Sequence, residues 1–84
     1  NMSIREMQNL ISQNGKFTFI DGNTDEGMIV SRYNIPEARI EYYFIPSNNV
    51  TAYQAARSHH QLDAHIKLGR PVNESSILLA HMIN

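Results

Sequence analysis

The chain contains no cysteine, and none of its 84 residues lies in a long hydrophobic run. Without cysteine, neither a disulfide framework nor a thiolate metal site can form, and the redox compartment stays open. No apolar run approaches the roughly 18 residues of a membrane span, and no charged-then-apolar leader pattern stands at the front. We therefore expect a soluble, cytoplasmic protein that has no membrane partner.

An excess of charge of one sign is also lacking. Seven Lys and Arg stand against eight Asp and Glu, which gives a formal net charge of −1. Because this balance exerts no long-range attraction on polyanions, a nucleic-acid partner is not expected. A chain of this length predicts a single domain over residues 1–84 that buries about 60–65% of its unfolded surface. Asn1, which precedes Met2, is interpreted as an expression remnant.

The first half of the chain predicts one short helix and three strands. Ser3 and Glu6 have the spacing of a capping box, and the apolar positions that follow predict an amphipathic helix over residues 4–13. Asn14-Gly15 is expected to end this helix in a left-handed conformation. Strands are predicted over 16–20, 28–33 and 39–45 from alternating apolar residues, and the short links between them favour an antiparallel meander.

The second half predicts two helices. A long helix is expected from Ser47, or the asparagines after it, to about Leu68, with Gly69 in a left-handed conformation beyond its end. Some 20 helical residues span about 30 Å, against about 23 Å for a seven-residue strand, so this helix should overhang the sheet. Asn73 is expected to cap a last short apolar helix. The fold class is thus a two-layer α+β domain of order α-β-β-β-α-α.

The segment "RSHHQLDAHIKLGRP" (57–71) holds three of the four histidines. At about 100° per residue on the predicted helix, these histidines point in three directions and cannot share a metal ion. His59 and Asp63 alone have ligand spacing, and two ligands leave a zinc site incomplete. We therefore predict no metal and no cofactor. His59 is interpreted as a packing residue whose ring bonds to Asp63.

Apolar residues of the predicted long helix are spaced as a heptad seam. The seam consists of Ala52, Ala55, His59, Leu62, Ile66 and Gly69, with separations of three and four residues. Together with the apolar C-terminal segment "ILLAHMI" (77–83), the seam gives more apolar surface than one small core can bury. Self-association across a two-fold axis commonly buries such surface. The predicted oligomer interface comprises Ala55, His59, Leu62, Ile66, Ile77, Leu78 and Met82.

The stretch "DGNTDEG" (21–27) partly matches a calcium loop. Asp21, Asn23 and Asp25 have the 1-3-5 spacing of its oxygen ligands, but Gly27 falls at position seven and Arg32 at position twelve. A weak calcium site is therefore one hypothesis. The favoured interpretation is a polar hairpin loop whose side chains bond to their own backbone.

No nucleophile–base pair and no phosphate-binding glycine loop is recognisable, so enzyme activity is not expected. The leading hypothesis is a small interaction protein of the inhibitor, adaptor or sequestering type, which binds itself and an unidentified protein. One alternative is a small-ligand or nucleotide pocket between protomers, with positive groups from Arg57, His60, Lys67 and Arg70. The other is a weak RNA-binding sheet. It would require Ile40, Tyr42 and Phe44 to face the helices, leaving Tyr43 and Tyr33 to stack bases on the opposite face.

Overall fold

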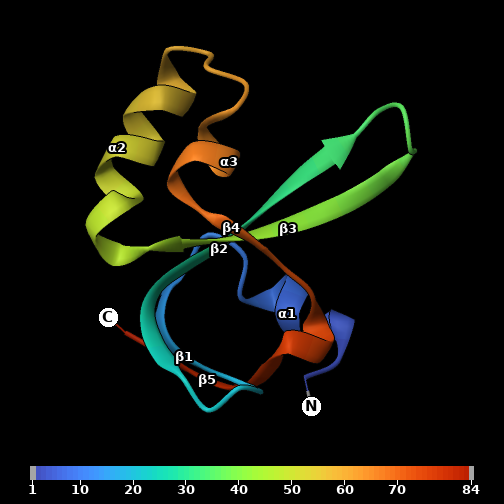
Figure 1. Ribbon diagram of the computed structural model, residues 1–84, viewed down its shortest axis with the longest axis vertical. Coiled ribbons are helices and arrows are strands. Elements are labelled where there is room, and N and C mark those ends of the chain that lie inside the picture. Colours follow the sequence, from blue (N-terminus) through green and yellow to red (C-terminus); the bar gives the residue numbers. More distant parts are fainter. Residues whose placement is uncertain (1, 84) are drawn as a thin grey trace.

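The computed structural model describes residues 2–83 and contains a five-stranded antiparallel sheet with helices on both faces (Figure 1). The helices are α1 (Ile4–Asn9), α2 (Ser47–Ser58) and α3 (Ala64–Leu68), with a 3₁₀ helix, η1 (Glu74–Ser76). The strands are β1 (Asn14–Phe19), β2 (Thr24–Asn34), β3 (Arg39–Pro46), β4 (Arg70–Val72) and β5 (Ile77–Met82), in the spatial order β4-β3-β2-β1-β5. The small antiparallel α+β domain is confirmed. The predicted antiparallel meander is present as β1, β2 and β3. The total of three strands, the two layers and the C-terminal helix are wrong.

The N-terminal helix begins as predicted and ends early. Ser3 Oγ accepts a hydrogen bond from the Glu6 backbone N–H at 3.1 Å, and Glu6 Oε1 accepts one from the Ser3 N–H at 3.1 Å. The left-handed residue after α1 is Ser12, with φ of 64°, whereas Asn14 and Gly15 start β1. A Cβ at Gly15 would lie 2.5 Å from the Cε of Met82, which is the end of a flexible side chain, and 3.1 Å from the backbone oxygen of His81.

The hairpin between β1 and β2 confirms the polar-loop interpretation of "DGNTDEG". Asp21 Oδ1 accepts the backbone N–H of Asn23 at 2.9 Å, and Gly22 has a positive φ of 91°. Side-chain bonds of this kind fix a tight turn. The turn is shorter than predicted, since β2 already begins at Thr24 and runs for 11 residues.

The long strand β2 gives the sheet its curled shape. Its first part pairs with β1, from Thr18↔Thr24 to Asn14↔Met28, and its part from Gly27 onward pairs with β3, ending at Asn34↔Arg39. The two hairpins therefore overlap only around Gly27 and Met28. The β2–β3 hairpin extends away from the body of the domain, while β1 and β5 curl beneath it (Figure 1).

The predicted long helix is broken into two. Helix α2 ends at Ser58, His60 takes a left-handed φ of 59°, and the chain turns before α3 starts. The turn brings Ala64 and Leu68 onto the sheet, where Ala64 is buried. The prediction that this helix overhangs the sheet is therefore wrong, since the 12 residues of α2 span only about 18 Å instead of about 30 Å. Gly69 is extended, with φ of −138°, and not left-handed.

The C-terminal segment is a strand instead of a helix. Asn73 does act as a cap, because its Oδ1 accepts the Ser76 N–H at 3.1 Å, but the capped element is the single turn η1. An apolar run does not by itself distinguish strand from helix. Strand β4, around Pro71, was not predicted, and it lies at an edge where a proline is tolerated.

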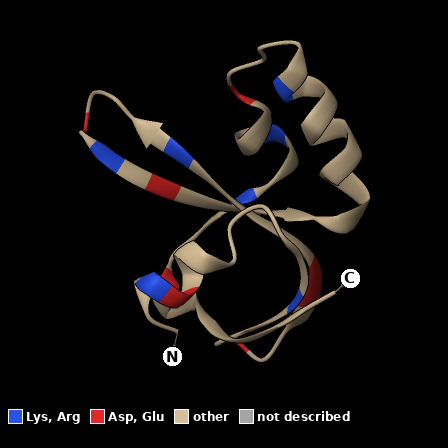
Figure 2. Cartoon of the chain, turned by 180° about the vertical axis from the view of Figure 1, so that it is seen from behind, with Lys and Arg blue, Asp and Glu red and all other residues tan. Residues whose placement is uncertain are grey.

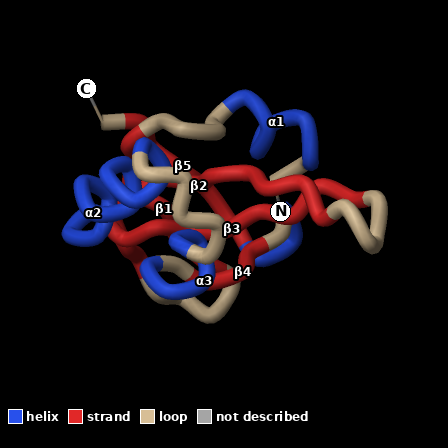
Figure 3. The backbone as a smooth tube through the Cα atoms, turned by 90° about the horizontal axis from the view of Figure 1, so that it is seen from above, coloured by secondary structure: helices blue, strands red, loops and turns tan. Residues whose placement is uncertain are grey.

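Apolar side chains form two cores, one on each face of the sheet. The first lies with α1 inside the curled sheet and includes Met2, Met7, Phe17, Phe19, Ile29, Tyr42, Phe44 and Ile77. The second lies under α2 and α3 and includes Met28, Val30, Ile45, Tyr53 and Ala64. Figure 3 shows α2 and α3 away from α1. The RNA-binding alternative requires the face of Tyr42 and Phe44 to meet the helices and the opposite face to be open; the first face meets α1, but the opposite face is covered by α2 and α3. No helix within residues 2–83 combines the length and hydropathy that crossing a membrane requires.

Candidate functional site

The helical residues predicted to form an oligomer seam do not share one stripe. Ala55 and His59 lie exposed at the end of α2, and the His59 ring donates from Nδ1 to the Ala55 carbonyl oxygen at 2.8 Å. The predicted partner, Asp63, instead forms an ion pair with Lys67 at 3.3 Å. Leu62, in the turn, and Ile66, on α3, border a groove described below.

The C-terminal members of that predicted interface differ in burial. Ile77 is fully buried in the first core, so its side chain has no surface to offer a partner. Met82 packs against the same core. Leu78 is exposed on β5. The seven predicted interface residues are thus divided among α2, the α3 region, the core and the edge strand.

The four positive side chains predicted to hold a ligand do not converge. Arg57 borders a hollow between α2 and β2, and His60 lies in the turn after α2. Lys67 is paired with Asp63. The guanidinium of Arg70 lies over the rings of two core phenylalanines, with its Cζ 4.8 and 5.0 Å from their centroids. Within one chain these groups cannot form a single pocket.

Tyr33 and Tyr43, predicted to stack bases together, lie on opposite faces of the sheet. Tyr33 pairs in register with Ile40, and directly paired residues point to the same face. Tyr43 lies on the other face, packed against the second core beneath the helices. The two rings therefore do not form one stacking platform.

The three residues of the partial calcium motif have other contacts. Asp21 bonds to both the backbone and the side-chain amide of Asn23. Asp25 Oδ1 accepts the N–H of Glu26 at 2.9 Å, and its Oδ2 lies 4.0 Å from Arg70 Nη1. In the part of the chain that the structure describes, no three His, Cys, Asp or Glu residues gather as a metal site would require.

The structure does create a groove that the sequence did not reveal. The groove has a volume of about 460 Å³ and lies between the outer part of the β2–β3 hairpin and the turn leading into α3. Its residues come from two segments, 32–43 and 62–66, which are brought together only by the packing of α3 on the sheet. We call it the hairpin–helix groove.

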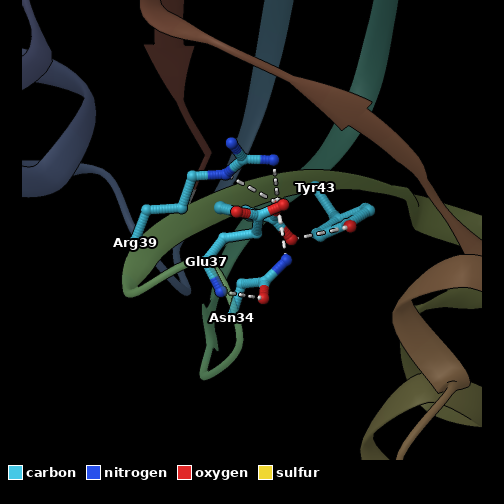
Figure 4. A network of polar contacts seen from close by, with 5 residues as sticks. Asn34, Glu37, Arg39 and Tyr43 are labelled. Atoms are coloured by element: carbon cyan, nitrogen blue, oxygen red, sulfur yellow. Dashed lines mark hydrogen bonds and ion pairs between the residues drawn. The ribbon is translucent and has the colours of Figure 1, made fainter.

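A network of hydrogen bonds forms the hairpin wall of this groove (Figure 4). Glu41 Oε2 accepts from Asn34 Nδ2 at 3.1 Å and from Arg39 Nε at 3.1 Å, and Arg39 Nη2 adds an ion pair at 3.0 Å. The bond from Asn34, followed by that from Arg39, lowers the pKa of the Glu41 carboxyl. Burial, and then the charge of Glu41, raises the pKa of Tyr43. The ionised form of Glu41 is therefore favoured, and its Oε2 is held by Asn34 and Arg39.

His65 and Arg32 stand on the inner side of the groove. The His65 ring meets Tyr43 edge-on, with the centroids 4.5 Å apart. Burial, and then the positive charge of Arg32, lowers the pKa of His65. Arg32 pairs in register with Glu41, but that carboxylate bonds to Arg39 instead. Within residues 2–83, Arg32 forms no ion pair, although it is half-buried.

Three aliphatic side chains border the groove and face solvent. Ile35 on the hairpin loop is 79% exposed, and Leu62 and Ile66 on the other wall are 74% and 63% exposed. Single exposed aliphatic residues are ordinary, whereas several around one hollow mark an interaction site. The heptad spacing singled out Leu62 and Ile66, but nothing in the sequence linked them to Ile35.

Comparison with protein-family models, with curated proteins and with solved structures gives no match to this chain.

The lowered pKa of His65 predicts a loss of stability in mild acid. Because the folded pKa lies below the ordinary value of 6.5, the unfolded chain takes up the proton first as the pH falls. The stability that depends on neutral His65 is thus fully present above pH 6.5 and decreases as the pH falls from there toward the folded pKa.

Urea unfolding of wild type, His65→Phe and His65→Gln from about pH 7.5 to about pH 5.5 tests this prediction. Both variants should lose less stability over this range than wild type. An identical pH slope in all three proteins would contradict the assignment.

Proposed function

We propose that this domain is a non-catalytic protein-binding module and that its hairpin–helix groove holds the partner. The observation that carries the proposal is the set of three exposed aliphatic side chains on the two walls of one groove. Burying an Ile or Leu side chain contributes about 1.5–3 kcal/mol. Three such side chains can anchor a partner, because a few buried residues supply most of the binding energy at interfaces.

The chemistry of the groove also restricts the partner. Arg32 is positive, half-buried and without an ion-pair partner among the described residues, whereas Glu41 is held by Asn34 and Arg39. A carboxylate of the partner would therefore find Arg32 and no free acidic group beside it. We infer that the partner presents a large apolar side chain close to an Asp or Glu.

A display library of random 12-residue peptides, selected on the immobilised domain, tests the proposal. The selected peptides should combine an aromatic or aliphatic residue with an acidic one. Affinities for the best peptide are then measured by fluorescence polarisation with the wild type and with variants. Ile66→Ser, Leu62→Ser and Arg32→Glu should each weaken binding by about tenfold or more, since each removes roughly 1.4 kcal/mol or more of contact.

A matched control is Ile20→Ser, because Ile20 is as exposed as Ile66, at 63%, but lies at the β1–β2 turn. This variant should bind the selected peptide as wild type does. The proposal would be overturned by peptides that bind equally well to all the groove variants. It would also be overturned by a library that yields no binder. A thermal shift with nucleotides that disappears in Arg32→Glu would favour the small-ligand alternative.

A further inference from the structure

The two edges of the sheet differ in how well they are protected. An unpaired edge strand exposes backbone N–H and C=O groups that can pair with another strand, and proteins commonly blunt such edges. Strand β4, at one edge, has three residues, of which one is Pro71 and another is the charged Arg70. Strand β5, at the other edge, has six residues and carries neither proline nor a charged side chain apart from His81.

Part of the β5 edge is closed by the chain itself. The backbone N–H of Met2 donates to the Ile77 carbonyl oxygen at 3.2 Å, and the register against β1 shifts beside Leu78. From Leu79 to Met82 the pairing with β1 is regular, and the Ile83 N–H donates to the Asn14 oxygen at 2.9 Å. The open part of the edge is therefore residues 79–83.

The backbone pattern shows which groups remain free. In an antiparallel pair, alternate residues direct both backbone groups to the neighbouring strand, and the residues between them direct theirs away. The backbone of Ile83 bonds to β1, so by alternation the backbone groups of His81 and Leu79 also point to β1. The backbone N–H and C=O groups of Ala80 and Met82 therefore point to the open edge. Ala80, a small residue, lies within the open part, one residue from its N-terminal end.

There is also room and apolar surface beside this edge. A groove of about 400 Å³ lies between α1 and β5, and its apolar lining includes Leu10, Leu78 and Leu79. Leu79 and Ile83 are each 44% exposed. Residues 77–83 include no Asp, Glu, Lys or Arg, and the strand that leads to the C-terminus is uncharged in Figure 2.

We propose that β5 pairs antiparallel with β5 of a second copy of this chain, across a two-fold axis at Ala80. Self-pairing suits this strand because it brings no like charges together and places the smallest side chain at the axis. Ala80 then exchanges hydrogen bonds with Ala80 of the second copy, and Leu79 lies opposite His81. The paired stretch is residues 79–81 of each copy, because beyond it Met82 and Ile83 would fall opposite Leu78 and Ile77, where the edge is irregular and closed by Met2. The two sheets become one ten-stranded sheet, with an interface of the isologous kind common in homodimers. The proposal is independent of the hairpin–helix groove, which is lined by residues of the β2–β3 hairpin and the α3 region and by none of β5.

Sedimentation or light-scattering mass, measured over rising concentration, tests this pairing. Wild type should approach twice its 9.6 kDa chain mass at high micromolar concentration. A Leu79→Lys/His81→Lys variant places lysines opposite each other across the axis, so its dimer dissociation constant should rise at least tenfold. A Leu79→Glu/His81→Glu variant should behave in the same way. An equimolar mixture of the two variants should restore the dimer, which a merely misfolded protein could not do.

Two further measurements keep the outcome unambiguous. Ile20→Lys, a control at another exposed apolar site, on the β1–β2 turn, should leave the mass of the dimer unchanged. The Ala80 amide should exchange with deuterium more slowly as concentration rises. A wild-type chain that stays single at high micromolar concentration would overturn the pairing, and so would a dimer that persists in both charge variants. Loss of peptide binding in the groove variants would not bear on it.

Discussion

Replacing Phe44 with alanine is expected to lower the free energy of unfolding by about 3–5 kcal/mol, the range for removing a buried phenylalanine. Phe44 is fully buried and meets Phe17 and Phe19 edge-on, with centroid separations of 5.6 and 5.3 Å. It stands on an inner strand of the sheet, paired in register with Ile29 on one side and with Arg70 on the other. No neighbouring element can collapse into the space without moving several strands.

The expected loss is large for a domain of this size. At about 0.05–0.15 kcal/mol per residue, a chain of 84 residues has a total stability of roughly 4–13 kcal/mol. Phe44→Ala should therefore be largely unfolded at moderate urea concentration, or even in buffer at the lower end of this range. Far-ultraviolet circular dichroism during urea and thermal unfolding measures the change directly.

Two variants distinguish the loss of core packing from the effect of shortening any apolar side chain. Phe44→Leu keeps most of the apolar volume and should cost less than Phe44→Ala. Ile35→Ala removes a side chain of similar chemistry from the most exposed site, at 79%, and should change stability by no more than about 0.5 kcal/mol. A loss below about 1 kcal/mol for Phe44→Ala would mean that Phe44 is not the centre of the core.

Local signals in the sequence predicted the local structure well. The capping box of Ser3 and Glu6, the turn around Gly22 and the strand that contains Phe44 all appear where the pattern placed them. Each of these depends on hydrogen bonds or alternation within a few neighbouring residues. A single sequence contains that information directly.

The errors occurred where packing between distant segments decides the conformation. The three- and four-residue spacing of apolar residues continues past His59, which predicted a continuous helix. The chain instead turns at His60, and this turn lets Ala64 pack on the sheet. The C-terminal run is apolar on all sides, which suits a helix as well as a strand, and its pairing with β1 settles the matter. Helix propensity is a weak signal that tertiary contacts commonly override.

The candidate site could be predicted only in part for the same reason. Leu62 and Ile66 were identified by their spacing, although for a helical seam that does not exist. Ile35 lies 27 positions before Leu62 and joins them only because α3 folds back beside the hairpin. The sequence did not single out Arg32. Its lack of an ion-pair partner arises because the Glu41 carboxylate, which is paired with it in register, binds Arg39 instead.

Replacing Gly27 with alanine is the second change expected to have a large effect. Gly27 is buried where β2 passes from one hairpin to the other, paired with Gly15 on β1 and with Pro46 on β3. A Cβ at this position would meet the backbone oxygen of Ile45 and lie 2.7 Å from Cζ of Phe44. The backbone oxygen cannot move away without disturbing the β2–β3 pairing.

We expect Gly27→Ala to lower the free energy of unfolding by about 2–3 kcal/mol, in the upper part of the range for overpacking. Gly22→Ala is the matched control, because Gly22 has φ of 91° but nothing within 4 Å of its added Cβ. That variant should lose only about 1–2 kcal/mol, from backbone strain alone. Urea unfolding of both proteins under one set of conditions compares the two costs. If Gly27→Ala proves as stable as wild type, or more stable than Gly22→Ala, then β2 and β3 do not approach each other as closely as the sheet requires.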